Sequence, residues 1–139
     1  MSDRRLRAVA IGLALAGAAI AAYLTWVHYA GIEPVCSAIS DCARVQSSPY
    51  AELGGIPVAL IGLFGYLALL GSLALPGEDG RALGAFLALV GLGFSAYLTY
   101  LELAVIHAIC QWCIVSAVAM AALAGVTVAR AARPNMVRP

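Results

Sequence analysis

The sequence predicts an all-α integral membrane protein: a four-transmembrane-helix bundle with one extracytoplasmic loop and a short half-helix lid. The composition is 63% hydrophobic and 11% charged, and the mean hydropathy of +0.95 lies far above that of soluble domains. Four apolar stretches are each long enough to cross a bilayer, and 139 residues are enough for one domain. The net charge of +1 gives no reason to expect a nucleic-acid partner.

The predicted domain covers residues 1–139, and its four spans contain no Asp, Glu or Arg. Because backbone polar groups in lipid must pair internally, each span should be a complete helix. Small residues along the spans would allow the helices to pack closely; they include Gly12/Ala16, Gly62/Gly65, Gly71, Gly84/Ala88 and Gly91/Ser95. The spans cover about residues 8–29, 56–75, 82–101 and 109–129, and residues 30–55 form the outer loop.

The arginines predict the orientation of the bundle. With an even number of spans, seven of them fall on one side, which the positive-inside rule assigns to the cytoplasm. Only Arg44 falls on the other side, so both termini should be cytoplasmic and both cysteine pairs extracytoplasmic. The seven are Arg4, Arg5, Arg7, Arg81, Arg130, Arg133 and Arg138. A cleavable signal peptide is the alternative for the first span, but its apolar stretch exceeds the roughly 7–15 residues of a signal h-region.

The segments between the spans differ in length. Residues 76–81 and 105–109 are short links, and the first of these, rich in helix-breaking residues, predicts a bare turn. Residues 30–55 form the one long loop, and long loops in compact proteins tend to be functional. Within it, residues 47–53 predict a short helix that could lie over the bundle mouth as a lid. Ser48 would be its N-cap and Gly54-Gly55 its end.

Four cysteines form two closely spaced pairs, Cys36/Cys42 and Cys110/Cys113. The second is a C-x-x-C, a spacing used by dithiol–disulfide redox centres and by metal sites. Cys110 begins the fourth span, where the helix N-terminus favours a thiolate, and Cys113 lies about one turn deeper. Two such pairs in series could relay electrons from an outside dithiol to a lipid-soluble acceptor by thiol–disulfide exchange. The sequence therefore predicts a membrane thiol oxidoreductase.

Four motifs follow one another along the chain: Cys36-x5-Cys42, Arg44-Val45-Gln46-Ser47-Ser48, Gly55-Ile56-Pro57, and the C-x-x-C that opens the last span. In this order they resemble the bacterial branch of the vitamin K epoxide reductase family, over nearly the whole chain. The resemblance implies a four-helix bundle that surrounds a quinone under a half-helix lid in the bacterial inner (cell) membrane.

The resemblance also implies roles for individual residues. Cys113 would react with the quinone, and Cys110 would be its resolving partner. Cys42 would exchange with Cys110, and Cys36 would meet the external dithiol. Ser48 would donate a hydrogen bond to a quinone carbonyl oxygen.

Two departures from the family pattern refine these expectations. Animal members carry a tyrosine four residues after the last cysteine, where this chain has Ala117. Ubiquinone or menaquinone is therefore the better candidate substrate than an epoxide. Many bacterial members carry a fused thioredoxin-like domain, and none follows Pro139. The expected thiol partner is therefore a separate thioredoxin-fold thiol oxidant protein.

Alternatives remain for several of these residues. The cysteines could instead be two structural disulfides of a non-enzymatic membrane interaction protein, or a zinc or copper site helped by His28 or His107. Our prediction includes no metal. Ser48 could be only a helix cap, and Trp112 only an interface anchor. Glu102 could be a proton relay for quinone reduction or a solvated side chain at the membrane interface.

Overall fold

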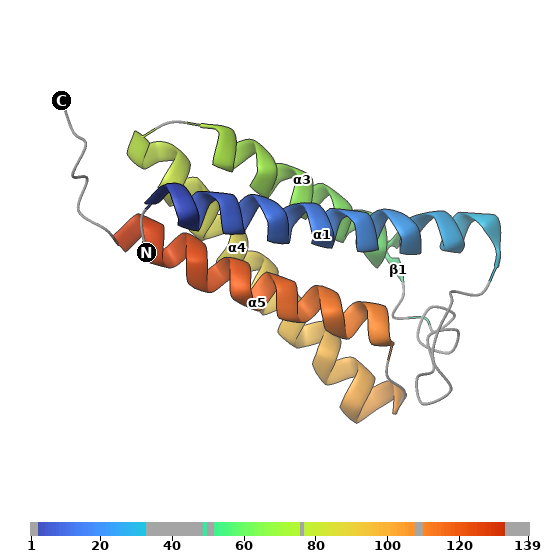
Figure 1. Cartoon of the computed structure of the whole chain (residues 1–139). Helices are drawn as coiled ribbons and strands as arrows, with labels where there is room; N and C mark the ends of the chain where they lie inside the picture. Colours follow the sequence, from blue (N-terminus) through green and yellow to red (C-terminus); the bar gives the residue numbers. More distant parts are fainter. Residues whose placement is uncertain (1–2, 33–48, 50–51, 76, 108–109, 133–139) are drawn as a thin grey trace.

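The computed structural model describes residues 3–32, 49, 52–75, 77–107 and 110–132. Helices α1 (Asp3–Ala30), α3 (Val58–Ala74), α4 (Gly77–Tyr100) and α5 (Gln111–Ala132) lie side by side as a bundle (Figure 1). A π-helical segment, η2 (Leu101–Ile106), extends α4. The segments Asp3–Ala30, Gly77–Ile106 and Gln111–Ala132 are long and apolar enough to span a membrane. The chain is thus an all-α membrane bundle.

Helix α3 is the shortest of the four, with 17 residues, at the lower end of the range of about 17–25 that can span a bilayer. It begins two residues later than the predicted span because Ile56–Pro57 form a short strand, β2. This strand pairs antiparallel with β1 (Glu52–Leu53). The short helix predicted over residues 47–53 is therefore wrong at its last two residues, while Ser47, Ser48, Tyr50 and Ala51 lie outside the described residues.

The reason for this difference lies in two glycines. Gly54 and Gly55 have φ values of 63° and 85°, and Leu53 pairs directly with Ile56 across them. Two successive residues at positive φ make the tight hairpin turn that suits twisted antiparallel strands, and glycine adopts that conformation without strain. The same dipeptide that would end a helix therefore reverses the chain between two strands.

The link predicted over residues 76–81 is also shorter than expected. Helix α4 begins at Gly77, so only the segment around Leu75 connects it to α3. Glu78 and Asp79 lie in the first turn of α4, where negative side chains are favoured by the helix dipole.

Charged side chains form ion pairs and a hydrogen bond between helices at the end of the bundle where α1 begins and α5 ends. One carboxylate oxygen of Asp3 lies 3.2 Å from Arg81 Nη2 and 3.2 Å from Arg130 Nε. Arg7 Nε donates a hydrogen bond of 2.8 Å to the carbonyl oxygen of Leu73. Arg7, Arg81 and Arg130 therefore lie at one end, as the sequence predicts, while Arg133 and Arg138 lie outside the described residues. The side of the membrane that this end faces remains a prediction.

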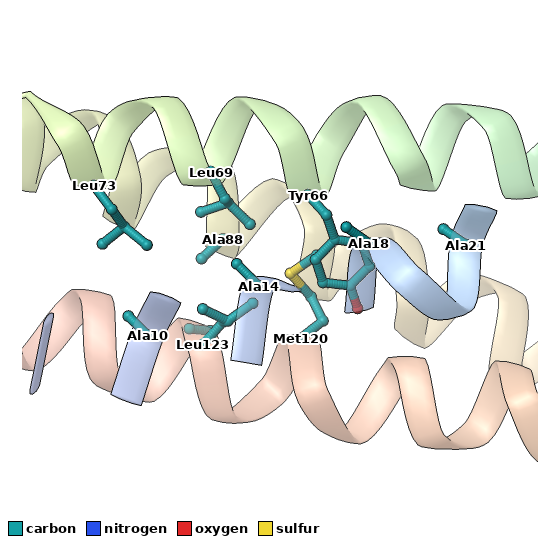
Figure 2. Packing of buried hydrophobic residues seen from close by; sticks show 11 residues of the cluster. Ala10, Ala14, Ala18, Ala21, Tyr66, Leu69, Leu73, Ala88, Met120 and Leu123 are labelled. Carbon is teal, nitrogen blue, oxygen red and sulfur yellow. The ribbon is translucent and has the colours of Figure 1, made fainter. Parts of the chain in front are cut away.

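The core is built on a row of small residues along α1. Ala10, Ala14, Ala18 and Ala21 are spaced three or four positions apart, so they share one face, and that face is buried. Large side chains of α3 and α5 pack against it (Figure 2): Tyr66, Leu69, Leu73, Met120 and Leu123. Because the alanines have no long side chains, these helices come close to α1 along its length.

Candidate active site

The Cys110/Cys113 pair lies where the sequence predicts it, at the N-terminus of α5. Cys110 immediately precedes the helix, and its carbonyl oxygen accepts the Ile114 N–H at 3.0 Å, so it closes the first helical turn. Its side chain is 0% exposed. Cys113 lies three residues further along in the same turn and is half-buried, and its thiol is in hydrogen-bonding contact with that of Cys110. The two sulfur atoms are therefore placed for thiol–disulfide chemistry with each other.

Glu102 lies beside this pair. Its side chain is only 3% exposed, its Oε2 accepts the Cys110 backbone N–H at 3.3 Å, and its carboxyl is in hydrogen-bonding contact with the Cys113 thiol. Of the two roles that the sequence allows for Glu102, the solvated interfacial one is wrong, because the carboxyl is buried.

The backbone explains how Glu102 reaches the cysteines. It belongs to η2, a π-helical segment whose wider turn ends at His107, and His107 takes the left-handed conformation at φ 58°. The His107 N–H bonds back to the Glu102 carbonyl oxygen. Such π-helical turns inside longer helices are frequent at functional sites. Here the turn closes the end of α4 immediately before the chain returns to α5.

A cavity of about 370 Å³ opens between α1, α3, α4 and α5, within the range of roughly 300–1,000 Å³ usual for small-molecule sites. Most of its wall is aliphatic or aromatic, and Cys113 and Glu102 line it. Its other polar side chains are Tyr66, Ser95, Thr99 and Ser116. The dithiol thus borders an apolar chamber that could hold a hydrophobic ligand.

Tyr66 is a further polar side chain on this cavity, and the sequence motifs do not point to it. The Tyr66 hydroxyl donates a 2.7 Å hydrogen bond to the Ser116 carbonyl oxygen and lies 2.8 Å from Ser116 Oγ. Ser116 follows Cys113 by three residues, so this pair lies about one turn along α5 from the thiol. A tyrosine in the middle of an apolar span, away from both interfaces, is the signal that could have identified it, because a buried hydroxyl needs a partner.

Other residues singled out by the sequence have simpler surroundings. Trp112 packs on Tyr23 of α1, with ring centroids 5.3 Å apart. His28 Nε2 lies 3.1 Å from Glu52 Oε2, and the His107 side chain is exposed. Within the described ranges, no group of three or more His, Cys, Asp or Glu side chains is placed to hold a metal ion. Ala117 lines the cavity.

Three predicted site residues, Cys36, Cys42 and Ser48, lie outside the described residues. Their placement relative to Cys110 and the cavity therefore stays a prediction.

A comparison with protein families agrees with this geometry. The model of the vitamin K epoxide reductase family matches residues 8–128. The match runs from the first turns of α1 into the last turns of α5 and includes the cavity, Glu102 and the Cys110/Cys113 pair.

Proposed function

The chain belongs to the vitamin K epoxide reductase family, whose members are membrane thiol oxidoreductases that use quinones, and we propose that it generates disulfides by reducing a membrane quinone. A reduced extracytoplasmic thioredoxin-fold protein supplies the two electrons. They pass first to Cys36/Cys42 and then to Cys110/Cys113, which delivers them to ubiquinone or menaquinone. The observation that carries this proposal is the position of Cys113 on the wall of an apolar cavity, in contact with Cys110.

The cavity supports a quinone as the electron acceptor. A quinone ring is flat and apolar and has two carbonyl oxygens, and the cavity wall is apolar apart from a few polar side chains. Glu102 and Cys113 are two of these side chains, the hydrogen-bonded Tyr66–Ser116 pair supplies two more, and Ser95 and Thr99 are the others. Apolar walls hold the ring, while the few polar groups orient it. We further propose that Ser48 donates to one carbonyl oxygen from the outer loop.

The geometry favours redox chemistry over the alternative of structural disulfides. A staple between elements needs no cavity and joins segments that would otherwise separate. Cys110 and Cys113 instead belong to one helical turn, and Cys113 faces a chamber large enough for a ligand. A bridge between them would add little to the fold, so its formation and breakage can serve electron transfer.

The direct test uses the purified protein in detergent with a reduced thioredoxin-fold dithiol protein and a soluble ubiquinone or menaquinone analogue. We expect quinone-dependent oxidation of the dithiol protein, with one hydroquinone formed per disulfide. Oxidation that is equally fast without quinone, or no oxidation with either quinone, would exclude this function. Menaquinone and ubiquinone are compared side by side to identify the quinone type.

We expect Ser48→Ala to weaken quinone binding and Cys36→Ala to prevent oxidation of the partner protein. Ser48→Ala removes one hydrogen bond to a quinone oxygen, which in a dry site costs about 1–3 kcal/mol, or roughly 5- to 150-fold in quinone affinity or rate. The Cys36/Cys42 disulfide of the Ser48→Ala variant should still exchange with the external dithiol protein. Cys36→Ala should bind quinone normally but fail to oxidise that protein. Quinone binding and partner oxidation are measured separately on both variants, with Ser47→Ala as the matched control. Parallel loss of both activities in both variants would contradict a relay with two centres.

The proposed orientation places both termini in the cytoplasm and the outer loop on the outside of the bacterial cell membrane. Cys36 should then react with a membrane-impermeant thiol reagent in intact cells whose disulfides have been reduced. Ala132→Cys, at the end of α5, is the control and should react only after lysis. Protection of Cys36 until the membrane is opened would reverse the orientation.

A further inference from the structure

Glu102 is a buried acidic side chain to which the electron path above gives no role. It is 3% exposed, and none of the ion pairs among the described residues includes it. A carboxylate held away from water without a cation is strongly disfavoured, so such groups in membrane proteins are rare and tend to be functional. The burial of the Glu102 carboxyl therefore needs a chemical explanation.

The surroundings of Glu102 provide a partner for each protonation state. The ionised carboxylate accepts the Cys110 backbone N–H at 3.3 Å. Its contact with the Cys113 thiol allows a proton to lie on either the oxygen or the sulfur. A group with hydrogen-bond partners in both states can take up and release a proton without moving. Since Glu102 and Cys113 both line the cavity, the proton can reach a ligand there.

From this geometry we infer that Glu102 is the proton carrier of the buried dithiol: it accepts the proton that leaves Cys113 and delivers it to the bound electron acceptor. This inference rests on the proposed function. In the overall step the two S–H bonds of Cys110 and Cys113 break, one S–S bond forms, and two electrons and two protons pass to the quinone, which becomes the hydroquinone. Glu102 transfers the proton from Cys113 and ends in its starting state.

Few other titratable side chains lie close enough to the reacting sulfur to take this role. The titratable side chains described around it are Cys110 and Cys113 at the start of α5 and, across the cavity, Tyr66 of α3. Helix α1 faces the cavity with apolar side chains alone. The Tyr66 hydroxyl already donates its proton to a hydrogen bond with the Ser116 carbonyl oxygen. Among the described residues, Glu102 is the carboxylic acid in contact with the Cys113 sulfur.

The test replaces Glu102 by Gln, which keeps an oxygen for the Cys110 N–H but cannot carry a proton. Glu78→Gln, at the opposite end of α4 and exposed, is the matched control. Two rates are measured from mildly acidic to alkaline pH on fully reduced protein. One is labelling of Cys113 by N-ethylmaleimide without quinone, and the other is hydroquinone formation in a single turnover.

We expect E102Q to label slowly at neutral pH and to recover as the pH rises, because hydroxide then removes the proton. Hydroquinone formation should fall about 10²-fold at neutral pH, the lower end of the usual contribution of a general base, and should also recover in alkali. Labelling and turnover that match the wild type and E78Q at every pH would overturn the inference. A loss that alkali does not restore would also overturn it, because it would indicate a structural role.

A second variant keeps the test decisive if E102Q does not accumulate. Glu102→Asp retains a carboxyl but withdraws it from the sulfur, so both rates should lie between those of the wild type and the uncatalysed pair, with a raised solvent deuterium isotope effect. Unchanged rates and isotope effect would overturn the inference. The labelling arm needs no quinone, so failure of the wild type to reduce quinone would contradict the proposed function alone.

Discussion

Replacing Cys113 by Ser is expected to abolish quinone-dependent oxidation of the partner protein. A hydroxyl at this position cannot form a disulfide with Cys110, so the two electrons have no route from the dithiol to the cavity. Turnover should fall by roughly 10⁴-fold or more, the scale seen when a nucleophile that acts within a catalytic unit is removed. The measurement is hydroquinone formation with a reduced dithiol protein as the electron source. Val115→Ala, an exposed position on the same helix, is the control and should keep its activity.

The other cysteines allow the order of the relay to be tested in the same assay. Cys110→Ser should leave Cys42 without its exchange partner, and Cys42→Ser should do the same to Cys110. Each variant should accumulate mixed or loop disulfides that resolve on non-reducing gels and by mass spectrometry. If each variant that lacks one of the four cysteines kept full quinone-dependent turnover, the electrons would not follow this relay.

Replacing Gly17 by Ala is expected to destabilise the bundle and distort the cavity. A methyl group at this position would overlap the Tyr66 ring, meeting its Cε1, Cζ and Cδ1 atoms. Tyr66 is 1% exposed and cannot swing into solvent, so α1 and α3 must separate or the ring must leave its hydrogen bonds to Ser116. Overpacking of this kind costs about 1–3 kcal/mol, and the loss of a hydrogen bond adds about 0.5–1.5 kcal/mol.

Gly12→Ala is the matched control, because it lies in the same helix and an added methyl group there meets no atom within 4 Å. We expect its thermal unfolding in detergent to match that of the wild type, while Gly17→Ala unfolds at a lower temperature and binds quinone more weakly. Equal unfolding temperatures for the two variants would mean that the α1–α3 contact is looser than the packing of Tyr66 on Gly17 implies.

Some features of the site were predictable because they are local. The C-x-x-C pair lies at a helix N-terminus because the apolar run that forms α5 starts at that point, and run length alone decides where a spanning helix can lie. Glu102 differs. It follows the predicted end of the third span by one residue, and nothing nearby in the sequence says whether a carboxyl at that depth faces water or protein. The π-helical turn of η2 and the return of the chain to Cys110 decide that question.

The sequence by itself determined the membrane class, the helical spans to within a few residues at most ends, and the position of the Cys110/Cys113 pair, because apolar run length and cysteine spacing act over one or two turns. Tertiary structure decided the rest. Gly12 and Gly17 are alike within α1, and only Tyr66, some fifty residues away, makes the second one intolerant of a side chain. Such contacts join segments distant in the chain, so their energies are absent from any local pattern.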